Sequence, residues 1–360
     1  MAAETPGARA WLWGTIALTA GAMATAVVLA PPAGAAAGPA LAYLLFAGSS
    51  AHVAATGWFY TVPEVRRHAG QHRGRFVWGP LALIVGAAAV AAAAPPRALD
   101  WLLLPFLAWQ FFHYQKQNLG LASLAAAAYR VARLRPAERG ALLAASLAGI
   151  GGLLARPGLL QVPVRTGLTA LWPAAAAAFA AAVATGLGCL ARRPAGQRPP
   201  AYCAAYLSAL AFSLPAFLFS SPYAAVAGMT IAHGLQYLLL VGLVAAGDPD
   251  GGRLERPVPA AGAPGGVPVG RVARLAILGN IALAGGAVLA AASGLQEAGP
   301  AVRLLYGAFA GAVMAHFVVD AGLWRLREEF PRAFLAGRVP YLVPGLVPGA
   351  PGAGVGRVGR

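Results

Sequence analysis

The stretch YAAVAGMTIAHGLQYLLLVGLVAA (223–246) contains no charged side chain and places one histidine, His233, near its middle. About 20 apolar residues in a helix suffice to cross the hydrocarbon core of a bilayer. The stretch is therefore long enough and apolar enough to span a membrane. We expect it to form a transmembrane helix with an ionisable group inside it.

Composition extends this expectation to the whole chain. Of its 360 residues, 59% are hydrophobic and only 11% are charged, whereas soluble domains carry about 25% charged residues. A soluble protein of this composition lacks the polar side chains needed to cover its surface. We predict an all-α, polytopic integral membrane bundle of about ten transmembrane helices. The expected helices cover residues 11–30, 39–61, 77–94, 99–129, 139–155, 169–190, 201–219, 223–246, 272–292 and 302–324.

Proline and glycine mark most breaks between these runs, as at Pro95-Pro96 and Pro199-Pro200. The first run has the length of a signal peptide. No basic cluster precedes it and Pro31-Pro32 follows it, which favours a first membrane helix. We predict one transmembrane domain over residues 1–338. The Pro- and Gly-rich tail, 339–360, is expected to be disordered or to lie on the surface.

The net charge of +16 indicates topology rather than nucleic-acid binding, because the charges lie in short segments between apolar runs. Basic loops stay in the cytoplasm. We therefore predict both termini in the cytoplasm and a place in the bacterial cytoplasmic (inner) membrane. The basic clusters follow the even-numbered helices and include Arg66, Arg67, Arg73, Arg75, Arg130, Arg133, Arg135, Arg139, Arg192, Arg193, Arg198, Arg253, Arg256, Arg271, Arg274, Arg325, Arg327, Arg332 and Arg338.

Four of the six histidines lie inside expected helices. They are His52 in SSAHVAATGWFY, His113 in WQFFHYQKQNLG, His233 in IAHGLQYL and His316 in AHFVVDAGLWR. Each is about 11 to 14 residues from the outer end of its helix, a depth of roughly 16 to 21 Å. The four helices run in the same direction under the predicted topology, so the imidazoles reach one level near the bilayer midplane.

Ionisable groups at that depth are costly and normally face a partner inside the bundle. We therefore predict that His52, His113, His233 and His316 share a transition metal, with Fe(II) first, since imidazole suits iron, copper and zinc. One b-type haem held by two of them is the alternative ligand. Four unrelated packing histidines remain the competing interpretation, because depth does not fix the rotation of a helix.

Polar residues near these histidines are expected to surround the metal as outer partners. Asp320 is one turn beyond His316 and can orient an imidazole through its second nitrogen, as carboxylates do at metal sites. It can equally pair with Lys116 or with a cytoplasmic arginine. The expected outer partners are Gln110, Lys116, Gln117, Gln236, Tyr237 and Asp320.

The remaining histidines, the cysteines and the common catalytic motifs give little indication of a functional site. His68 and His72 lie in the arginine-rich loop RRHAGQHRGR, where a surface or lipid-headgroup role is expected rather than a metal site. Cys189 and Cys203 have no metal-type spacing and are interpreted as packing residues. The chain has no phosphate-binding glycine-rich loop, no HExxH helix and no GxSxG turn.

The segments FHYQKQNLG (112–120), IAHGLQYL (231–238) and HFVVDAGLWR (316–325) resemble segments of poorly characterised multi-pass bacterial membrane proteins. More distantly, histidines inside a polytopic bundle resemble the Brp/Blh family of β-carotene 15,15′-dioxygenases. That resemblance implies a non-haem iron held by histidines and oxidative cleavage of a carotenoid. It reaches only the four intramembrane histidines, and here each lies on its own helix, whereas the family tends to place two on one helix.

Three functions are compatible with these features. The first is a membrane-embedded non-haem iron oxygenase acting on a lipophilic substrate, such as a carotenoid or another lipid, reached from the bilayer. The second is an electron carrier with one b-type haem. The third is a transporter with a polar site at the midplane, which internal repeats and broken helices would favour. No individual catalytic residue and no redox partner can be named from the sequence.

Overall fold

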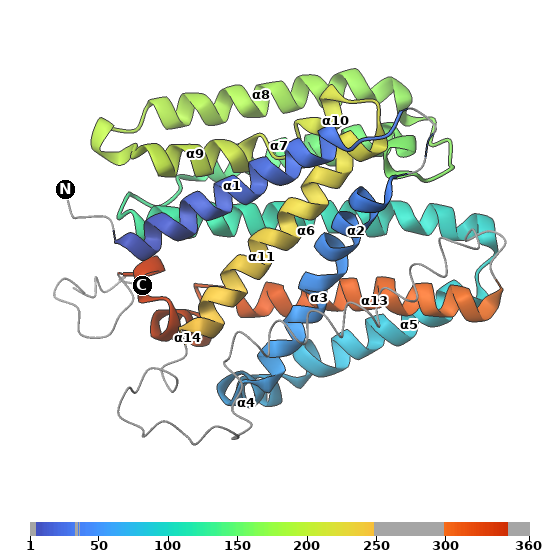
Figure 1. The fold of residues 1–360 in the computed structure, drawn as a ribbon, viewed down its shortest axis with the longest axis horizontal. Coiled ribbons are helices and arrows are strands. Elements are labelled where there is room, and N and C mark those ends of the chain that lie inside the picture. The colour runs from blue at the N-terminus through green and yellow to red at the C-terminus, as the bar shows by residue number, and fades with distance from the viewer. Residues whose placement is uncertain (1–4, 33–34, 36, 248–298, 345–360) are drawn as a thin grey trace, which may run out of the picture.

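The computed structural model describes residues 5–32, 35, 37–247 and 299–344, and this part of the chain contains helices and no strands (Figure 1). Within it, seven segments are long and apolar enough to cross a membrane. The all-α membrane bundle is thus confirmed, while the count of about ten spans and the cytoplasmic termini stay predictions. The expected helix 272–292 lies outside the described residues. The seven segments are Pro6–Val28, Pro39–Thr61, Gly74–Ala93, Pro136–Ala155, Leu168–Ala191, Tyr223–Ala246 and Pro300–Leu323.

Proline begins many of these helices. Its missing N–H is no loss in the first turn, where that group has no partner within the helix anyway. This rule sets the starts of α1 (Pro6–Val28), α2 (Pro39–Phe46), α7 (Pro136–Ala155) and α13 (Pro300–Leu323). In α1, the side chain of Thr5 also accepts a hydrogen bond from the backbone nitrogen of Ala8 at 3.3 Å.

The second span changes its helical pitch three times. After α2 comes a π-helical turn, η1 (Ala47–Ala51), then α3 (His52–Ala55) and a 3₁₀ segment, η2 (Thr56–Thr61). π-turns are rare in proteins and frequently occur at functional sites. The irregular pitch lies at the middle of an apolar span, and it begins five residues before His52.

A proline also divides one of the helices expected from the sequence. The run 201–219 is divided into α9 (Pro200–Leu210) and α10 (Pro215–Leu218), so the prediction of one continuous helix there is wrong. Pro215 has no N–H to donate to the preceding turn, and its ring disfavours a helical conformation just before it. The chain therefore turns at this point and starts again at Pro215.

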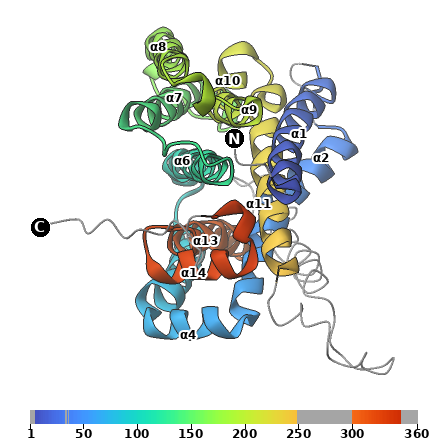
Figure 2. The same ribbon diagram turned by 90° about the vertical axis from the view of Figure 1, so that its left-hand side faces the viewer.

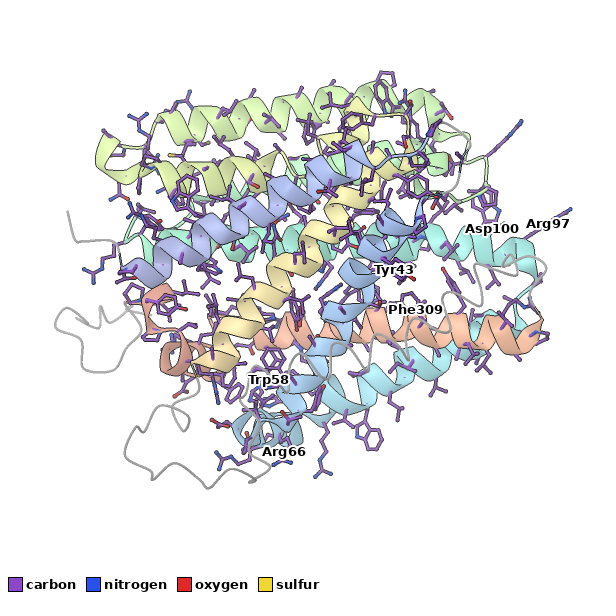
Figure 3. The ribbon with its side chains drawn as sticks, viewed as in Figure 1. Tyr43, Trp58, Arg66, Arg97, Asp100 and Phe309 are labelled. Atoms are coloured by element: carbon purple, nitrogen blue, oxygen red, sulfur yellow. The ribbon has the colours of Figure 1, made fainter. Side chains whose placement is uncertain are left out.

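The longest helix, α6 (Pro96–Ala128), has 33 residues and contains Pro105 in its interior. It falls outside the seven apolar segments because its middle carries many polar side chains, among them Gln110 and Lys116. Figure 3 shows Arg97 and Asp100 at one end of the molecule and Arg66 towards the other. The remaining described helices are α4 (Pro63–Gln71), α5 (Gly79–Ala93), α8 (Trp172–Ala191), α11 (Gly228–Ala246) and α14 (Glu329–Arg338).

Small residues let several helices approach closely. A Cβ atom on Gly307 or Gly311 of α13 would collide with the backbone of α5 at Ala87 or Ile84. Likewise, α1 packs on α11, where Gly228 faces the backbone of Met23. Such contacts are common between membrane helices, whose association depends on close packing. They join α13 to α5 and α1 to α11, and Figure 2 shows α1 lying against α11.

The two ends of the described chain lie at the same end of the bundle. In Figure 1, the start of α1 and the short helix α14 both lie at the left. Residues Val339, Leu342 and Val343 belong to the expected tail, yet they are buried in the main hydrophobic core. Helix α14 and the turn after it are therefore part of the packed structure.

Candidate metal centre

Four buried histidines from four different helices lie together in the structure. His52 begins α3, His113 lies in α6, His233 in α11 and His316 in α13. Their side chains are 2%, 8%, 0% and 3% exposed. Figure 1 shows how this happens: α11 runs obliquely across α6 and α13, with α2 and α3 beside them.

The four imidazoles form a closed ring of edge-to-face contacts. The ring centroid of His52 is 4.7 Å from that of His233 and 4.8 Å from that of His316. The centroid of His113 lies 5.0 Å from that of His233 and 5.1 Å from that of His316. Across the ring, His233 and His316 are farther apart, at 6.5 Å. The arrangement is therefore a quadrilateral with one imidazole at each corner.

Hydrogen bonds fix the outer side of two of these rings. His52 donates from Nδ1 to the carbonyl oxygen of Gly48 at 2.7 Å. His316 uses Nδ1 to contact the hydroxyl of Thr56 at 2.7 Å. In a neutral imidazole, a protonated Nδ1 leaves Nε2 with a free lone pair. Both rings are thus oriented with an electron-pair donor on the opposite nitrogen.

The inner nitrogens have no hydrogen-bond partner among the described residues. These atoms are Nε2 of His52, His113 and His316, and both ring nitrogens of His233. Buried polar atoms are nearly always paired, since an unpaired one costs free energy. Each of the four imidazoles therefore has an unpaired nitrogen at one place, and a neutral ring has one lone pair to offer to a missing partner.

The distances suit a metal ion. Ligand atoms of His52, His233 and His316 all lie within 4.8 Å of one another, and so do those of His113, His316 and Asp320. His316 is common to the two sets. Its Nδ1 is used by Thr56, and its Nε2 faces the carboxylate of Asp320. These buried groups can hold a metal ion.

Asp320 lies between the cluster and a chain of hydroxyl groups. Its Oδ2 is 3.5 Å from Nε2 of His316 and 3.9 Å from Nε2 of His113. Its Oδ1 accepts a hydrogen bond from the hydroxyl of Tyr237 at 3.0 Å, and that hydroxyl contacts the hydroxyl of Thr56 at 2.8 Å. The single hydroxyl proton of Thr56 lies within reach of both the Tyr237 oxygen and the backbone oxygen of His52, the latter at 3.3 Å. The chain thus links one imidazole to the carboxylate through two hydroxyls.

The predicted outer partners occupy several different places. Gln117 donates to the backbone oxygen of His233 and to the side-chain oxygen of Gln236, each at 3.0 Å. Gln236 donates onward to Thr19 at 2.7 Å. These two glutamines therefore tie α6 to α11 and α1 and have no hydrogen bond with an imidazole ring. Gln110 is hydrogen-bonded to the hydroxyl of Tyr114.

Lys116 lies apart from the cluster. It is exposed, and it makes no hydrogen bond or ion pair with any residue that the structure describes. The alternative pairing of Asp320 with Lys116 is absent, because Asp320 faces Tyr237, His113 and His316 instead. Of the predicted outer partners, Asp320 and Tyr237 are the two that reach the imidazoles.

Some contributors were not anticipated from the sequence. The ring of Tyr114 stacks on His233 with centroids 4.1 Å apart, and Phe317 stacks on His113 at 4.3 Å. A Cβ on Gly234 would collide with the carbonyl of Gly48, the group that orients His52. The sequence signal for this close approach was the pair of glycines, Gly48 in AGSS and Gly234 in AHG, because each lies close to an intramembrane histidine.

The other two histidines form a separate pair at the end of α4, where His68 lies in the last turn and His72 directly follows the helix. His68 and His72 have ring centroids 4.3 Å apart, and His68 stacks on Phe330 of α14 at 4.1 Å. Partial burial, and after it the charge of His72, lowers the pKa of His68 below its usual value. No third ligand of the metal-binding type joins them among the described residues.

The fold and the cluster together define the class of protein. It is a multi-pass helical membrane protein with a buried cluster of histidines and one carboxylate between its helices. No protein-family model, no curated protein and no solved structure matches the chain.

Proposed function

We propose that the protein is a membrane-embedded oxygenase whose four histidines, His52, His113, His233 and His316, hold one non-haem iron. The observation that carries the proposal is the group of unpartnered imidazole nitrogens facing one another inside an apolar bundle. Packing histidines usually have partners for their nitrogens, whereas these nitrogens have none among the described residues. A metal ion is the partner that satisfies them all at once.

The donor set favours iron among the metals that bind imidazole. Four neutral imidazoles with a nearby carboxylate suit a divalent first-row ion, and iron with histidine and carboxylate ligands is typical of non-haem oxygenases. A ferrous ion in such a site supplies the chemistry that activates dioxygen. The residues of the chain contribute orientation: Gly48 and Thr56 turn two imidazoles inward, and Asp320 holds the chain of hydroxyls behind them.

A lipophilic substrate fits the surroundings of the site. The cluster is packed between apolar helices, and Phe317 covers His113 while contacting Trp109 at 5.5 Å between ring centroids. Trp109 is 38% exposed on the surface of the bundle. A substrate dissolved in the bilayer, such as a carotenoid, meets aromatic rings along this route, in line with the resemblance to carotenoid-cleaving enzymes.

The proposed reaction balances without an external reductant. One C=C bond of the substrate and the O–O bond of dioxygen are broken. Each of the two carbons takes one oxygen atom and leaves as a carbonyl group. All four electrons needed to reduce dioxygen come from the substrate, so only a lipophilic alkene and dioxygen are consumed.

A haem carrier agrees less well with the geometry. A bis-histidine haem needs two imidazoles on opposite faces of a wide porphyrin. Here four imidazoles contact one another edge to face, with centroids 4.7 to 5.1 Å apart around the ring. The rings themselves occupy the space that a porphyrin would need.

We also propose ten spans with both termini in the cytoplasm of a bacterial inner membrane. Support comes from the basic loops after even-numbered helices, and from the position of α1 and α14 at one end of the bundle (Figure 1). Reporter fusions at residue 260 and at the C-terminus should both report cytoplasm. A periplasmic signal from either fusion contradicts this topology.

Metal analysis and a visible spectrum of the purified protein test the metal proposal. We expect about one iron per chain and no Soret band. A strong Soret absorbance that disappears when two of the four histidines are replaced would favour the haem carrier. Incubation of the iron-loaded protein with β-carotene under dioxygen tests the substrate class, with carbonyl products as the expected result.

A further inference from the structure

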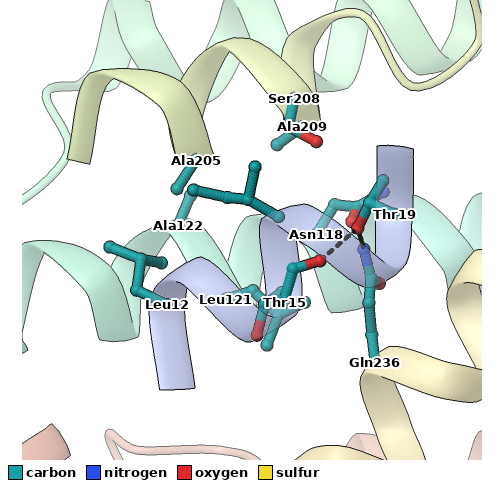
Figure 4. Close-up of a pocket in the computed structure, with 11 residues that line it drawn as sticks. Leu12, Thr15, Thr19, Asn118, Leu121, Ala122, Ala205, Ser208, Ala209 and Gln236 are labelled. Carbon is teal, nitrogen blue, oxygen red and sulfur yellow. Dashed lines mark hydrogen bonds between the residues drawn. The ribbon is translucent and has the colours of Figure 1, made fainter. Parts of the chain in front are cut away.

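A small cavity with several polar side chains in its lining lies where four helices meet. It is lined by residues of α1, α6, α9 and α11, as Figure 4 shows. The cavity offers about 20 Å³ to a water-sized molecule, and roughly 10–15 Å³ is enough for one water. Its polar lining consists of Thr15, Thr19, Asn118, Ser208 and Gln236.

One lining group lacks a partner. The side chain of Asn118 is only 3% exposed, and its Nδ2 has no hydrogen-bond partner among the described residues. A buried amide in this state costs free energy unless something in the cavity pairs with it. The cavity and the unpaired amide are independent observations, and both indicate a bound molecule.

The neighbouring groups specify what that molecule must do. Thr15 donates its hydroxyl proton to the backbone oxygen of Trp11 at 2.8 Å, which leaves its oxygen as an acceptor. Thr19 donates to the backbone oxygen of Thr15 at 2.7 Å and accepts from Gln236. Asn118 offers a donor. The occupant must therefore accept a hydrogen bond from Asn118 and donate one to Thr15.

We infer that the cavity binds one structural water molecule, which accepts from Asn118 and donates to Thr15. A metal cation is a poor occupant because all five polar lining residues are neutral and Asn118 presents an N–H group. Water also serves either orientation of the amide, since it both donates and accepts. A site with two to four polar partners is the usual setting of a conserved internal water.

The water bridges helices that carry the histidines to helices that do not. Asn118 lies five residues after His113 on α6, and Gln236 lies three residues after His233 on α11. Thr15 belongs to α1 and Ser208 to α9. The bridge extends the network of Gln117, Gln236 and Thr19, which already joins α6, α11 and α1.

A structure at a resolution that shows internal waters tests the inference directly. We expect one solvent peak within hydrogen-bonding distance of Asn118 and Thr15 in the unaltered protein. Asn118→Leu keeps the volume and removes the donor, so the peak should vanish. Ser123→Ala is the matched control, because it deletes a polar group on the same helix outside the cavity lining. An empty cavity, an acyl chain in it, or a peak that survives Asn118→Leu would overturn the assignment.

A double-mutant cycle gives a second readout that needs no map. Thr15→Val removes the acceptor and loosens the water that Asn118 requires. Thr15→Val should lower the melting temperature more in the unaltered protein than in Asn118→Leu. In Asn118→Leu no buried amide depends on the water, so loosening it costs less. Equal losses in both backgrounds would contradict a shared water. Neither variant alters a histidine, so the outcome is independent of the proposed iron.

Discussion

Two of the buried polar clusters in the described part of the protein differ in whether their polar groups all have hydrogen-bond partners. The first is the histidine cluster in the middle of the bundle. The second is the ion pair of Glu138, near the start of α7, with Arg193, which directly follows the span of α8; their side chains are 0% and 1% exposed. Arg193 donates to the carboxylate at 2.5 Å through Nε and 2.7 Å through NH2.

The ion pair is complete within the protein. Arg193 also donates to the backbone oxygens of Ala132 and Arg133, and the carboxylate accepts from the backbone of Arg135. Its hydrogen bonds to Glu138 raise the pKa of Arg193 above its usual value. The histidine cluster, in contrast, leaves its inner nitrogens unpaired. The comparison teaches that a buried polar group with all partners present has a structural role, whereas one that lacks them indicates a ligand.

The largest expected effect is the loss of metal from histidine variants. Replacing His52, His113, His233 or His316 with Ala should remove most of the metal, since each contributes to the same ion. Effects should be strongly non-additive, so a second replacement adds little to the first. Metal stoichiometry at matched folding is the measurement.

The surface pair provides the control for that series. His68→Ala and His72→Ala should leave metal content unchanged, because these residues lie at the end of α4 and join no third ligand among the described residues. If two of the four buried histidines were removed with full metal retained, the single-centre interpretation would be wrong. The contrast with the Glu138–Arg193 pair would then disappear too.

The second effect should appear at the ion pair and should be purely structural. Arg193→Ala leaves the buried carboxylate of Glu138 uncompensated, which typically costs about 3–5 kcal/mol. We expect a large drop in melting temperature in detergent, while the folded fraction keeps its metal. Arg192→Ala, at an exposed neighbouring position, should change little. Metal loss from folded Arg193→Ala protein would contradict the division of roles.

The sequence predicts the histidines better than their surroundings. A histidine in an apolar run stands out by chemistry alone, so His52, His113, His233 and His316 were identifiable without a structure. Rotation was not. Lys116 and Gln117 both lie within about one turn of His113, yet Gln117 bonds to α11 and Lys116 is exposed.

Two further features depend on tertiary contacts that no local pattern encodes. The π-turn η1 changes the pitch of the second span, and this determines which residues near His52 face the cluster. Arg193 was counted only as one charge of a basic loop, but its partner Glu138 is 55 positions away in the chain. The helical class follows from composition, whereas pairing across the bundle follows from packing.

An intermediate effect is expected from the hydroxyl chain that orients His316. Thr56→Val and Tyr237→Phe each break the link from His316 to Asp320 while keeping the shape of the side chain. Outer partners of metal ligands typically contribute about 10–100-fold in affinity. Metal affinity from competition with a chelator should fall by that order. Thr185→Val, whose hydroxyl bonds only within α8, is the matched control, and equal affinity in all variants would contradict the chain.

The smallest effect concerns the histidine pair at the end of α4 and the pH dependence of stability. Partial burial, and after it the charge of His72, lowers the pKa of His68 below the ordinary value of 6.5. The unfolded chain therefore binds a proton at this position more readily than the folded protein does, and unfolding is favoured as pH falls through that range. The stabilising contribution is fully present above pH 6.5 and declines below it. In His68→Gln the melting temperature should thus fall less between pH 7 and pH 5 than in the unaltered protein, with metal content the same at pH 7. An identical decline in both proteins would show that proton binding at His68 is not coupled to folding, and the contact with Phe330 would then be packing alone.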